Sequence, residues 1–274
     1  GEPAVQSETE LQLLRQAIEQ YAVAQGARLV LFKDVPARFR SLMQSLEITG
    51  YRRVPSMPGA RLRLDFASFE DYLRQRLGRV YRKGLRRKFR ESERRANLVM
   101  ELVNDLRPYI DEVYPLYRQT YERSRMRFEC LTPEYFCRLG ERMGDRARFF
   151  LWRLAEGKGR SGRVVAFSCC MVHDGRLYDL NVGMDYSVAY RLHLYFVTWR
   201  DLVIWAQANG LREYYTGPLN YDPKLHLKME LAPLDLYARH VSPWLNGVFG
   251  LALKWLEPVR YDPTLARFPN AAEL

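Results

Sequence analysis

The amino-acid sequence predicts an α/β (α+β) fold in which helices flank a mixed, largely antiparallel sheet. Two observations lead to this prediction. Segments with strand-like and helix-like apolar spacing alternate, and the second half reads helix, helix, strand, hairpin, helix, strand, strand, helix. The chain has 274 residues, of which 47% are hydrophobic, enough for one large domain or two smaller ones. The N-terminal quarter shows the same kind of layer on a smaller scale.

The N-terminal quarter contains a predicted helix, a strand and a second helix. Residues 8–25 carry apolar side chains at helical spacing, and Gly26 ends this helix. Residues 28–35 form a predicted strand, after which Pro36 begins a helix that runs to about Glu47. The next segment, GYRRVPSMPGARLRLDF, is expected to give one or two short strands because its two prolines interrupt it.

The most basic part of the chain is a predicted helix that begins after Ser68, with Asp71 three residues further on. Its apolar stripe consists of Leu73, Leu77, Tyr81, Leu85 and Phe89. Gly78 and Gly84 weaken the helix locally. Between Arg74 and Arg95, eleven lysines and arginines accompany two glutamates, a net charge of +9 in 22 residues out of +11 for the whole chain. Such a helix either binds an anionic partner or presents a solvated face to water.

The middle of the chain alternates strands and helices up to a predicted hairpin. The predicted elements are a strand at 97–103, helices at 106–125 and 133–143, a strand in RARFFLWRLAE with GKGRSGR as its turn, and a hairpin in VVAFSCCMVHDGRLYDLNVGMD. Thr132 and Pro133 mark the start of the second helix. Asp174 and Gly175 form the tight turn of the hairpin.

The last part of the chain ends in an unusually apolar helix. The predicted elements are a helix in YRLHLYFVTWRDLVIWAQANG, strands in LREYYTG and PLDLYARH, and a helix in WLNGVFGLALKWLEPV. The final helix either covers the core or touches a lipid or acyl chain. The apolar side chains that would do so are Trp244, Leu245, Phe249, Leu253, Trp255 and Leu256.

Composition and motifs exclude several classes of protein. No run of about 18 apolar residues exists, so a transmembrane helix is not expected, and the N-terminal residues lack the pattern of a signal peptide. The four cysteines, Cys130, Cys137, Cys169 and Cys170, are expected to be buried reduced thiols of a cytoplasmic protein. The four histidines show no metal-ligand spacing, and P-loop, Rossmann and nucleophile-elbow motifs are absent.

Two stretches could hold a reaction. In NVGMDYSVAYRLHLYF, a strand ends and a helix begins near Arg191, and a helix N-terminus with a nearby arginine suits a phosphate. In YTGPLNYDPKLHLKMELAPLDLYARH, Tyr221 and Lys224 share one face if the segment is helical. A tyrosine can protonate a leaving thiolate, and a lysine can bind an anion or a developing oxyanion. The alternatives are a junction that binds nothing and a polar loop with a surface lysine.

The chain resembles the GNAT acyltransferase superfamily, in particular an acetyltransferase-like branch related to the Fem-type peptidoglycan transferases. The resemblance extends from about Phe66 to Asn246 and rests on the basic helix, the strand–loop–helix around SVAYRL, and NYDPKLHLKMELAPLDLYARH. The last of these is similar to a Tyr-x-x-Lys-x-x-Leu-Gly pattern followed by a Pro-Leu-x-x-Tyr strand, with Lys228 in place of the glycine. The glycine-rich donor loop of simple GNAT enzymes and the coiled-coil arm of Fem enzymes are both missing.

The resemblance implies a GNAT-like fold with a particular domain organisation. Residues 1–66 would form a partial GNAT-like half, residues 67–96 a basic connecting helix, and residues 97–274 the catalytic domain. An acyl thioester would lie where two central strands separate, and an acceptor amine would attack it directly.

The resemblance also implies site residues. Tyr221 and Lys224 would be catalytic, and Asp185 or His193 would deprotonate the amine. The residues implied to contact the donor are Asn181, Gly183, Tyr186, Ser187, Val188, Ala189, Tyr190, Arg191 and Leu192.

The function expected from the resemblance is an N-acyltransferase that uses acyl-CoA or an acyl-carrier protein as co-substrate, with no tightly bound cofactor. Its partners would be the acyl donor, an amine acceptor, and an anionic carrier protein or tRNA on the helix between Arg74 and Arg95. Two alternatives stay open. One is a Fem-like transferase that depends on aminoacyl-tRNA, and the other is a non-enzymatic module that binds an anionic surface.

Overall fold

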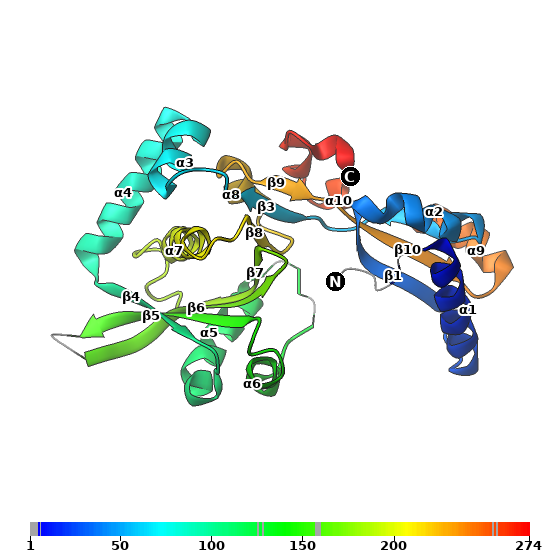
Figure 1. The fold of residues 1–274 in the computed structure, drawn as a ribbon, viewed down its shortest axis with the longest axis horizontal. Helices are drawn as coiled ribbons and strands as arrows, with labels where there is room; N and C mark the ends of the chain where they lie inside the picture. The colour runs from blue at the N-terminus through cyan, green and yellow to red at the C-terminus, as the bar shows by residue number, and fades with distance from the viewer. Residues whose placement is uncertain are drawn as a thin grey trace. The chain divides into compact units, whose positions relative to one another are not determined.

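The computed structural model describes residues 5, 7–124, 126–127, 129–156, 160–253, 255 and 257–274. The chain divides into two compact units (Figure 1). Unit 1 consists of Gly1–Arg61 and Pro218–Leu274, and unit 2 consists of Leu62–Gly217. The residues from Pro218 onward thus group with the N-terminal residues, whereas the domain scheme expected from the sequence placed them with residues 97–217.

Unit 1 is built on an antiparallel sheet in the order β1-β10-β2. The elements of this layer are α1 (Glu8–Ala24), β1 (Leu29–Pro36), η1 (Ala37–Phe39), α2 (Arg40–Ile48), β2 (Arg52–Pro55) and β10 (Leu234–His240). A capping box between Ser7 and Glu10 begins α1. The helices α1 and α2 bury Leu11 and Leu46 against Val30 and Tyr237 on one face of the sheet.

The rest of unit 1 comes mostly from the C-terminal part of the chain. Its elements are α8 (Tyr221–His226), β9 (Glu230–Ala232), α9 (Pro243–Leu253), α10 (Pro258–Tyr261), η4 (Leu265–Arg267) and η5 (Ala271–Glu273). Strand β3 (Gly59–Arg63) begins in unit 1 and continues past its boundary at Arg61. The helix α8 packs Tyr221 against Leu231, Leu265 and Phe268. Neither α8 nor β9 was predicted from the sequence, because both are too short to show a clear apolar period.

Unit 2 has a mixed, largely antiparallel sheet, which confirms the predicted fold class. Its elements are α3 (Phe69–Arg76), α4 (Arg79–Arg95), β4 (Leu98–Val103), η2 (Arg107–Tyr109), α5 (Ile110–Arg123), α6 (Pro133–Arg142), β5 (Ala147–Glu156), β6 (Arg160–His173), β7 (Arg176–Met184), α7 (Leu194–Ala208) and β8 (Glu213–Thr216). The strands follow the order β4-β5-β6-β7-β8. Among these five strands, as far as the structure describes them, β7 and β8 are the one parallel pair.

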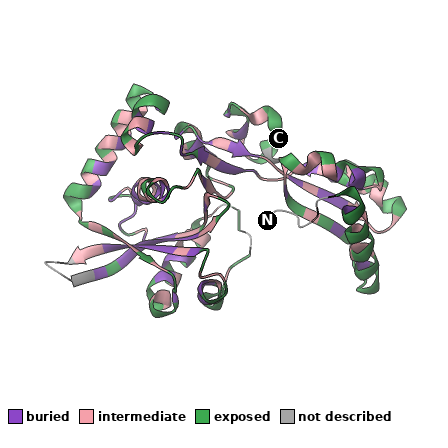
Figure 2. Ribbon diagram, viewed as in Figure 1, coloured by how far each residue is buried: buried purple, intermediate pink, exposed green. Residues whose placement is uncertain are grey.

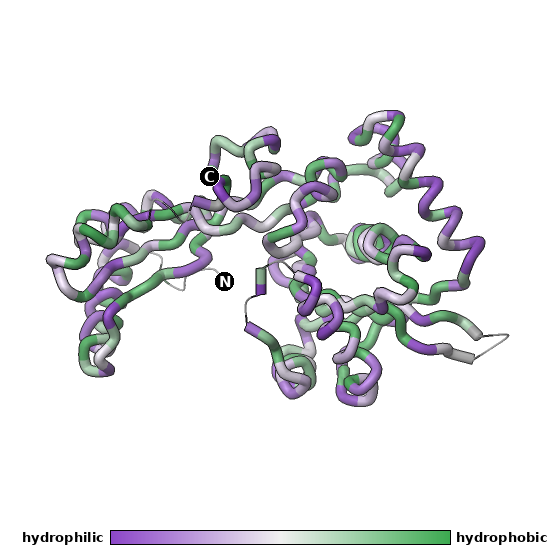
Figure 3. Tube along the Cα trace, turned by 180° about the vertical axis from the view of Figure 1, so that it is seen from behind, coloured by the Kyte–Doolittle hydropathy of each residue, from purple (hydrophilic) through white to green (hydrophobic). Residues whose placement is uncertain are grey.

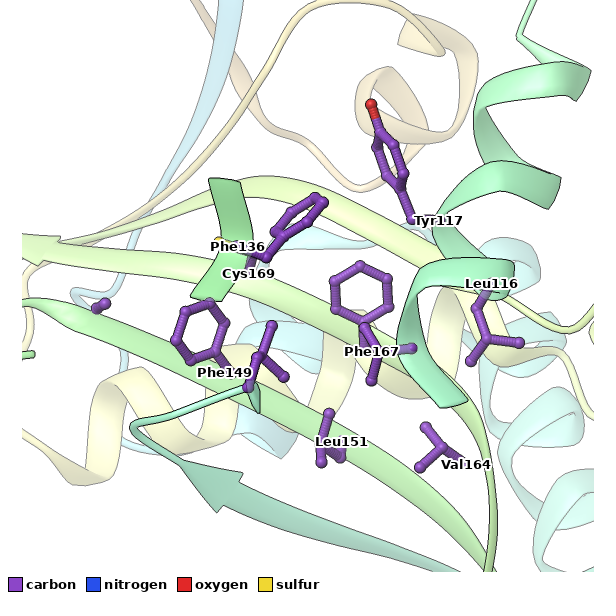
Figure 4. Packing of buried hydrophobic residues seen from close by; sticks show 11 residues of the cluster. Leu116, Tyr117, Phe136, Phe149, Leu151, Val164, Phe167 and Cys169 are labelled. Carbon is purple, nitrogen blue, oxygen red and sulfur yellow. The ribbon is translucent and has the colours of Figure 1, made fainter. Parts of the chain in front are cut away.

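The core of unit 2 has side chains on both faces of its sheet. On one face, α5 and α6 pack Leu116, Tyr117 and Phe136 against β5 and β6 (Figure 4). On the other face, Phe150 contacts the Trp205 ring of α7 at 4.9 Å between centroids. Because successive strand residues point to opposite faces, the continuous apolar run of β5 fits a strand covered on both sides. Figure 2 shows these central strands as largely buried.

The predicted hairpin turn is confirmed, and two predicted helices need correction. Asp174 and Gly175 have φ values of 48° and 68°, as a two-residue hairpin turn requires. The single basic helix expected after Ser68 is two helices, α3 and α4, because Leu77 is extended and Gly78 has a non-helical ψ of 150°. The helix expected from about Arg191 begins only at Leu194.

Other expectations differ in detail. Cys130 is exposed rather than buried, whereas the other three cysteines are buried. The helix expected at 106–125 is a 3-10 turn followed by α5, and residue 125 lies outside the described residues. Residues 157–159 of the expected GKGRSGR turn, and residues 254 and 256 of the expected final helix, also lie outside them. Within the described part of the chain, no helix is long and apolar enough to cross a membrane.

Candidate functional site

The central feature of unit 2 is the separation of two parallel strands. Strand β7 pairs with β8 only from Arg176 to Asp179. It then continues to Met184 while paired with β6. Over the described residues, no strand pairs with the other edge of β7 between Leu180 and Met184. The backbone groups on this edge can therefore bond to an extended ligand.

A β-bulge marks the point of separation. In the ladder between β6 and β7, Cys170 lies opposite Asp179 and Cys169 lies opposite Asn181, so Leu180 is an extra residue. A bulge bends a strand and redirects its side chains and backbone groups. The change in pairing and the change in direction thus occur within two residues of Asp179.

Asp179 is the central polar residue at this point. Its carboxylate accepts a hydrogen bond of 2.6 Å from the Tyr214 hydroxyl and another from the Ser168 hydroxyl. Burial, and then the Asp179 charge, raise the pKa of Tyr214 well above its ordinary value, so this hydroxyl keeps its proton. The sequence prediction missed Asp179, although a carboxylate inside the otherwise apolar hairpin was a usable signal.

At the C-terminal end of β7, side chains of α5 bond to the backbone of the unpaired edge. The Met184 N–H donates to Thr120 Oγ1 at 3.2 Å, and the Tyr186 N–H donates to Gln119 Oε1 at 3.1 Å. A Cβ on Gly183 would lie 2.6 Å from the Tyr117 backbone nitrogen and 2.2 Å from the Phe167 ring. Gly183 is therefore required by the close approach of α5 to β7.

The predicted base Asp185 is buried at the end of β7. Its carboxylate accepts the Ser187 N–H at 2.9 Å and forms an ion pair with Arg163. Burial acts to raise the pKa of Asp185, but the hydrogen bonds from Ser187 and Arg163 outweigh it and hold the pKa below its ordinary value. Asp185 thus fixes the start of the loop that follows β7.

The loop predicted to bind the donor phosphates folds as tight turns between Asp185 and His193. The Val188 and Ala189 N–H groups both donate to the Asp185 carbonyl. The side chains of Val188, Ala189 and Leu192 are buried, whereas those of Ser187, Tyr190 and Arg191 are exposed. Among the described residues, the Tyr190 and Arg191 N–H groups have no acceptor. They are available to an anion.

The other predicted base, His193, joins this loop to the basic helix α4. Its Nε2 lies 3.0 Å from Glu91 Oε2, and its backbone has a left-handed φ of 50°. The hydrogen bond with His193 is the main cause that lowers the pKa of Glu91. Arg95 donates to the Arg191 carbonyl at 2.7 Å, so the C-terminal end of α4 lies against the loop.

The outer face of α4 carries a stripe of exposed cations. Its members, here called the α4 stripe, are Arg79, Lys83, Arg87, Arg90 and Arg94. At 100° and 1.5 Å per residue, they lie within an arc of about 80° over a length of roughly 22 Å. A shallow hollow between them is lined by Arg87, Arg90, Glu93 and Arg94. Figure 3 shows α4 as strongly hydrophilic. Like charges at this spacing repel one another, so the stripe is suited to an anionic partner.

The remaining predicted site residues, Tyr221 and Lys224, lie in unit 1 on α8. Tyr221 is 1% exposed, and its hydroxyl donates to the Pro58 carbonyl at 2.7 Å. Lys224 is 4% exposed rather than a surface lysine, and its Nζ donates to the Leu219 carbonyl at 2.7 Å. Leu219 and Asn220 have φ values of 71° and 51° before the helix begins. The structure thus groups the predicted residues in two sets, one in each unit.

Comparison with solved structures shows the same fold in several proteins. FemX has a TM-score of 0.61 at 14% identity, over 84% of this chain and 76% of FemX. L-PGS from Bacillus licheniformis has a TM-score of 0.58 at 17% identity, over 89% of this chain and 77% of that protein. The C-terminal domain of a putative lysylphosphatidylglycerol synthetase from Agrobacterium fabrum has a TM-score of 0.56 at 16% identity, over 88% of this chain and 75% of that domain.

Comparison of the sequence with protein-family models assigns the chain to a family. No curated protein matches the chain. The family model described as an acetyltransferase (GNAT) domain matches residues 79–225, which is more than half of the chain. This range contains α4, the separated strands, the loop after β7 and the start of α8. The chain therefore belongs to the GNAT acetyltransferase family.

Proposed function

We propose that the protein is an N-acyltransferase that moves an acyl group from an acyl thioester to an amine by direct attack. The observation that carries this proposal is the separation of β7 from β8 after Asp179 in a chain of the GNAT family. A gap between parallel strands offers unpaired backbone groups to an extended amide arm, as a missing strand would. The thioester arm of CoA or of an acyl-carrier protein has this character.

The donor's phosphates would bind at the loop after β7. The free N–H groups of Tyr190 and Arg191 and the guanidinium groups of Arg191 and Arg95 provide hydrogen-bond donors and positive charge at one place. The arm would then run along the edge of β7 toward Asp179, with Asn181 and Gly183 beside it.

The reaction needs no covalent enzyme intermediate. The amine nitrogen forms a bond to the thioester carbonyl carbon, the carbon–sulfur bond breaks, and the sulfur leaves as a thiolate. Backbone N–H groups at the strand separation would stabilise the developing oxyanion. The proton lost by the amine would pass to Asp179, whose carboxylate lies at this separation and is held by Tyr214 and Ser168. The thiolate would take a proton from water, because Tyr221 and Lys224, which the resemblance implied for this step, are buried in unit 1 and already donate to the Pro58 and Leu219 carbonyls.

The two bases suggested by the sequence have different roles in this proposal. Asp185 would position the loop, because Arg163 and the Ser187 N–H already occupy its carboxylate. His193 would connect the loop to α4 through Glu91. Replacing either one should therefore weaken donor binding more than it slows the chemical step.

Calorimetric titration with CoA and acetyl-CoA, at low and at moderate salt, tests the proposal. We expect one saturable site that survives moderate salt, weaker binding by Arg191→Ala, and unchanged binding by Arg146→Ala, an exposed arginine just before β5. Binding that appears only at low salt would mean that α4 merely attracts phosphate. Failure of both free and carrier-linked thioesters to bind would contradict the proposal.

The α4 stripe favours one second candidate, a transferase that takes its acyl group from aminoacyl-tRNA. The stripe extends over roughly 22 Å, which is longer than the phosphates of one CoA molecule require. The test is tRNA binding measured at several salt concentrations. We expect affinity to fall steeply with salt and to be lost when Arg79, Lys83 and Arg87 are changed to Glu. Acetyl-CoA turnover that such changes leave intact would exclude this candidate.

A further inference from the structure

The helix α9 of unit 1 has a fixed inner face. Asn246 accepts the His240 N–H at 3.0 Å and donates to the Gly50 carbonyl at 2.8 Å. Phe249 and Leu253 pack against Val54 and Ala238 of the sheet. These contacts hold the helix on β10 and β2 and determine which residues face outward.

The outer face of α9 is apolar, unlike that of an ordinary surface helix. Trp244 is 91% exposed, Val248 68% and Leu251 65%, and Leu245 lies beside them. The spacing i, i+4, i+7 places the first three on one stripe. From Pro243 to Leu253 the helix contains no charged side chain. Both faces of α9 are therefore apolar, and the described residues cover only the inner one.

The edge strand β1 extends the apolar surface on the same face of the sheet. Leu31 lies opposite Ala238, which packs under α9, and Leu29 lies opposite His240. Directly opposite residues in an antiparallel pair point to the same face. The His240 ring lies 6.5 Å from that of Phe249, which joins the two parts of the surface. We call this surface the α9 patch, and its exposed members are Leu29, Leu31, Trp244, Leu245, Val248 and Leu251.

One cation lies at the rim of the α9 patch, and a second follows α9 in the chain. Arg52 is exposed, lies opposite Ala238 on the face covered by α9, and extends along Gly250. Arg260 lies over the ring of Trp255, which is 70% exposed, at 5.2 Å from its centroid, and its Nε also pairs with Glu257 at 3.4 Å, so Arg52 is the cation with the clearer place at this surface. An apolar centre with tryptophans at its ends and arginines at its rim is the composition of a surface that lies in a membrane interface.

We propose that the α9 patch docks unit 1 on an anionic lipid surface. Trp244, Val248 and Leu251 would enter the boundary between headgroups and acyl chains, while Arg52 and Arg260 would contact lipid phosphates. In a symmetric dimer the patch would face itself and bring the rim arginines of two copies together, which disfavours a second copy as the occupant. This proposal is independent of the proposed acyltransferase activity.

Vesicle flotation with the full chain tests the proposal. Vesicles of phosphatidylcholine with phosphatidylglycerol are compared with vesicles of phosphatidylcholine alone, at low and at moderate salt. We expect the chain to float with the anionic vesicles at both salt concentrations. The triple variant Trp244→Gln, Val248→Gln, Leu251→Gln should bind at least about tenfold more weakly, because it removes the inserted apolar area.

A matched control variant carries Leu13→Gln, Tyr21→Gln and Ile48→Gln. These three apolar side chains are exposed on α1 and α2, and the two helices pack on the opposite face of the sheet. It should bind vesicles like the wild type. Absence of flotation by the wild type, or equal flotation by the triple variant, would overturn the proposal. Binding that persists in the triple variant and disappears with salt would assign the attraction to the α4 stripe. Light scattering that shows a dimer lost in the triple variant, without vesicle binding, would make a second copy the occupant.

Discussion

Two carboxylates, one in each unit, lie on strands beside a buried tyrosine, and their surroundings differ. Asp235 of β10 is 0% exposed and is bonded by Arg40 and Arg53, both at 2.7 Å. Asp179 of β7 is half-buried where two strands separate, and it accepts hydrogen bonds from the hydroxyls of Tyr214 and Ser168.

Under the proposed mechanism, the position of each carboxylate in the fold would make Asp235 structural and Asp179 reactive. Asp235 is buried, so its negative charge is used to bind the guanidinium groups of Arg40 and Arg53. Asp179 borders an edge of β7 with which no strand of the described residues pairs. Replacing Asp179 should therefore lower the catalytic rate, whereas replacing Asp235 should lower the free energy of unfolding.

The largest expected effect is that of Asp179→Asn on catalysis. Loss of the proton acceptor should lower kcat by about 10²–10⁴-fold. Because asparagine keeps the shape and still accepts from Tyr214, the midpoint of urea unfolding should change little. Steady-state kinetics with a thioester donor, together with the pH dependence of kcat, measures this effect. A variant with wild-type kcat would remove Asp179 from the mechanism.

The next effect is that of Asp235→Ala on stability. Removing the carboxylate leaves two guanidinium groups without their partner, which should lower the free energy of unfolding by about 3 kcal/mol. Urea denaturation measures the loss. Glu47→Ala, at an exposed carboxylate of the same unit, is the matched control and should change stability by less than about 0.5 kcal/mol. Equal losses in the two variants would contradict the structural role of Asp235.

Replacing the tyrosine beside each carboxylate should have a smaller effect, and it tests a single hydroxyl group. The Tyr214 hydroxyl donates to Asp179 at 2.6 Å, so Tyr214→Phe should cost about 2 kcal/mol of unfolding free energy. Its effect on kcat should follow that of Asp179→Asn in direction and be smaller. A Tyr214→Phe variant as stable as the wild type would show that this hydrogen bond contributes nothing net.

The smallest effect has the opposite sign. The Tyr237 hydroxyl beside Asp235 is buried, and no described residue bonds to it. Tyr237→Phe removes an unsatisfied group and should stabilise the protein by about 1 kcal/mol. Unchanged or lower stability would indicate that a buried water satisfies this hydroxyl.

The same tyrosine predicts a pH dependence. Burial, and then the Asp235 charge, raise the pKa of Tyr237 to about 12 in the folded chain. The folded chain thus holds the Tyr237 proton more tightly than the unfolded chain, whose tyrosine pKa is near 10. The free energy of unfolding that comes from this difference is fully present below about pH 10 and is lost as the pH rises toward 12. Unfolding experiments across this window should show a shallower alkaline loss in Tyr237→Phe than in the wild type.

Much of the fold could be predicted because its signals are local. Ser68 and Thr132 cap the helices that follow them, and the Asp174-Gly175 turn gives the hairpin its register. The apolar spacing of β5, β6 and α7 located the central layer. Part of the candidate site could also be found in this way, because the loop from Tyr186 to Leu192 follows a recognisable strand.

The sequence by itself determined the periodicity of the elements, the turn chemistry and the basic face of α4, since each depends on neighbours a few residues apart. Only the tertiary structure decided that β7 separates from β8 after Asp179, and that residues 218–274 fold with residues 1–61. It also decided that Lys224 is buried and that the outer face of α9 is uncovered. These features depend on contacts between residues far apart in the chain, and no local pattern of side chains specifies such contacts.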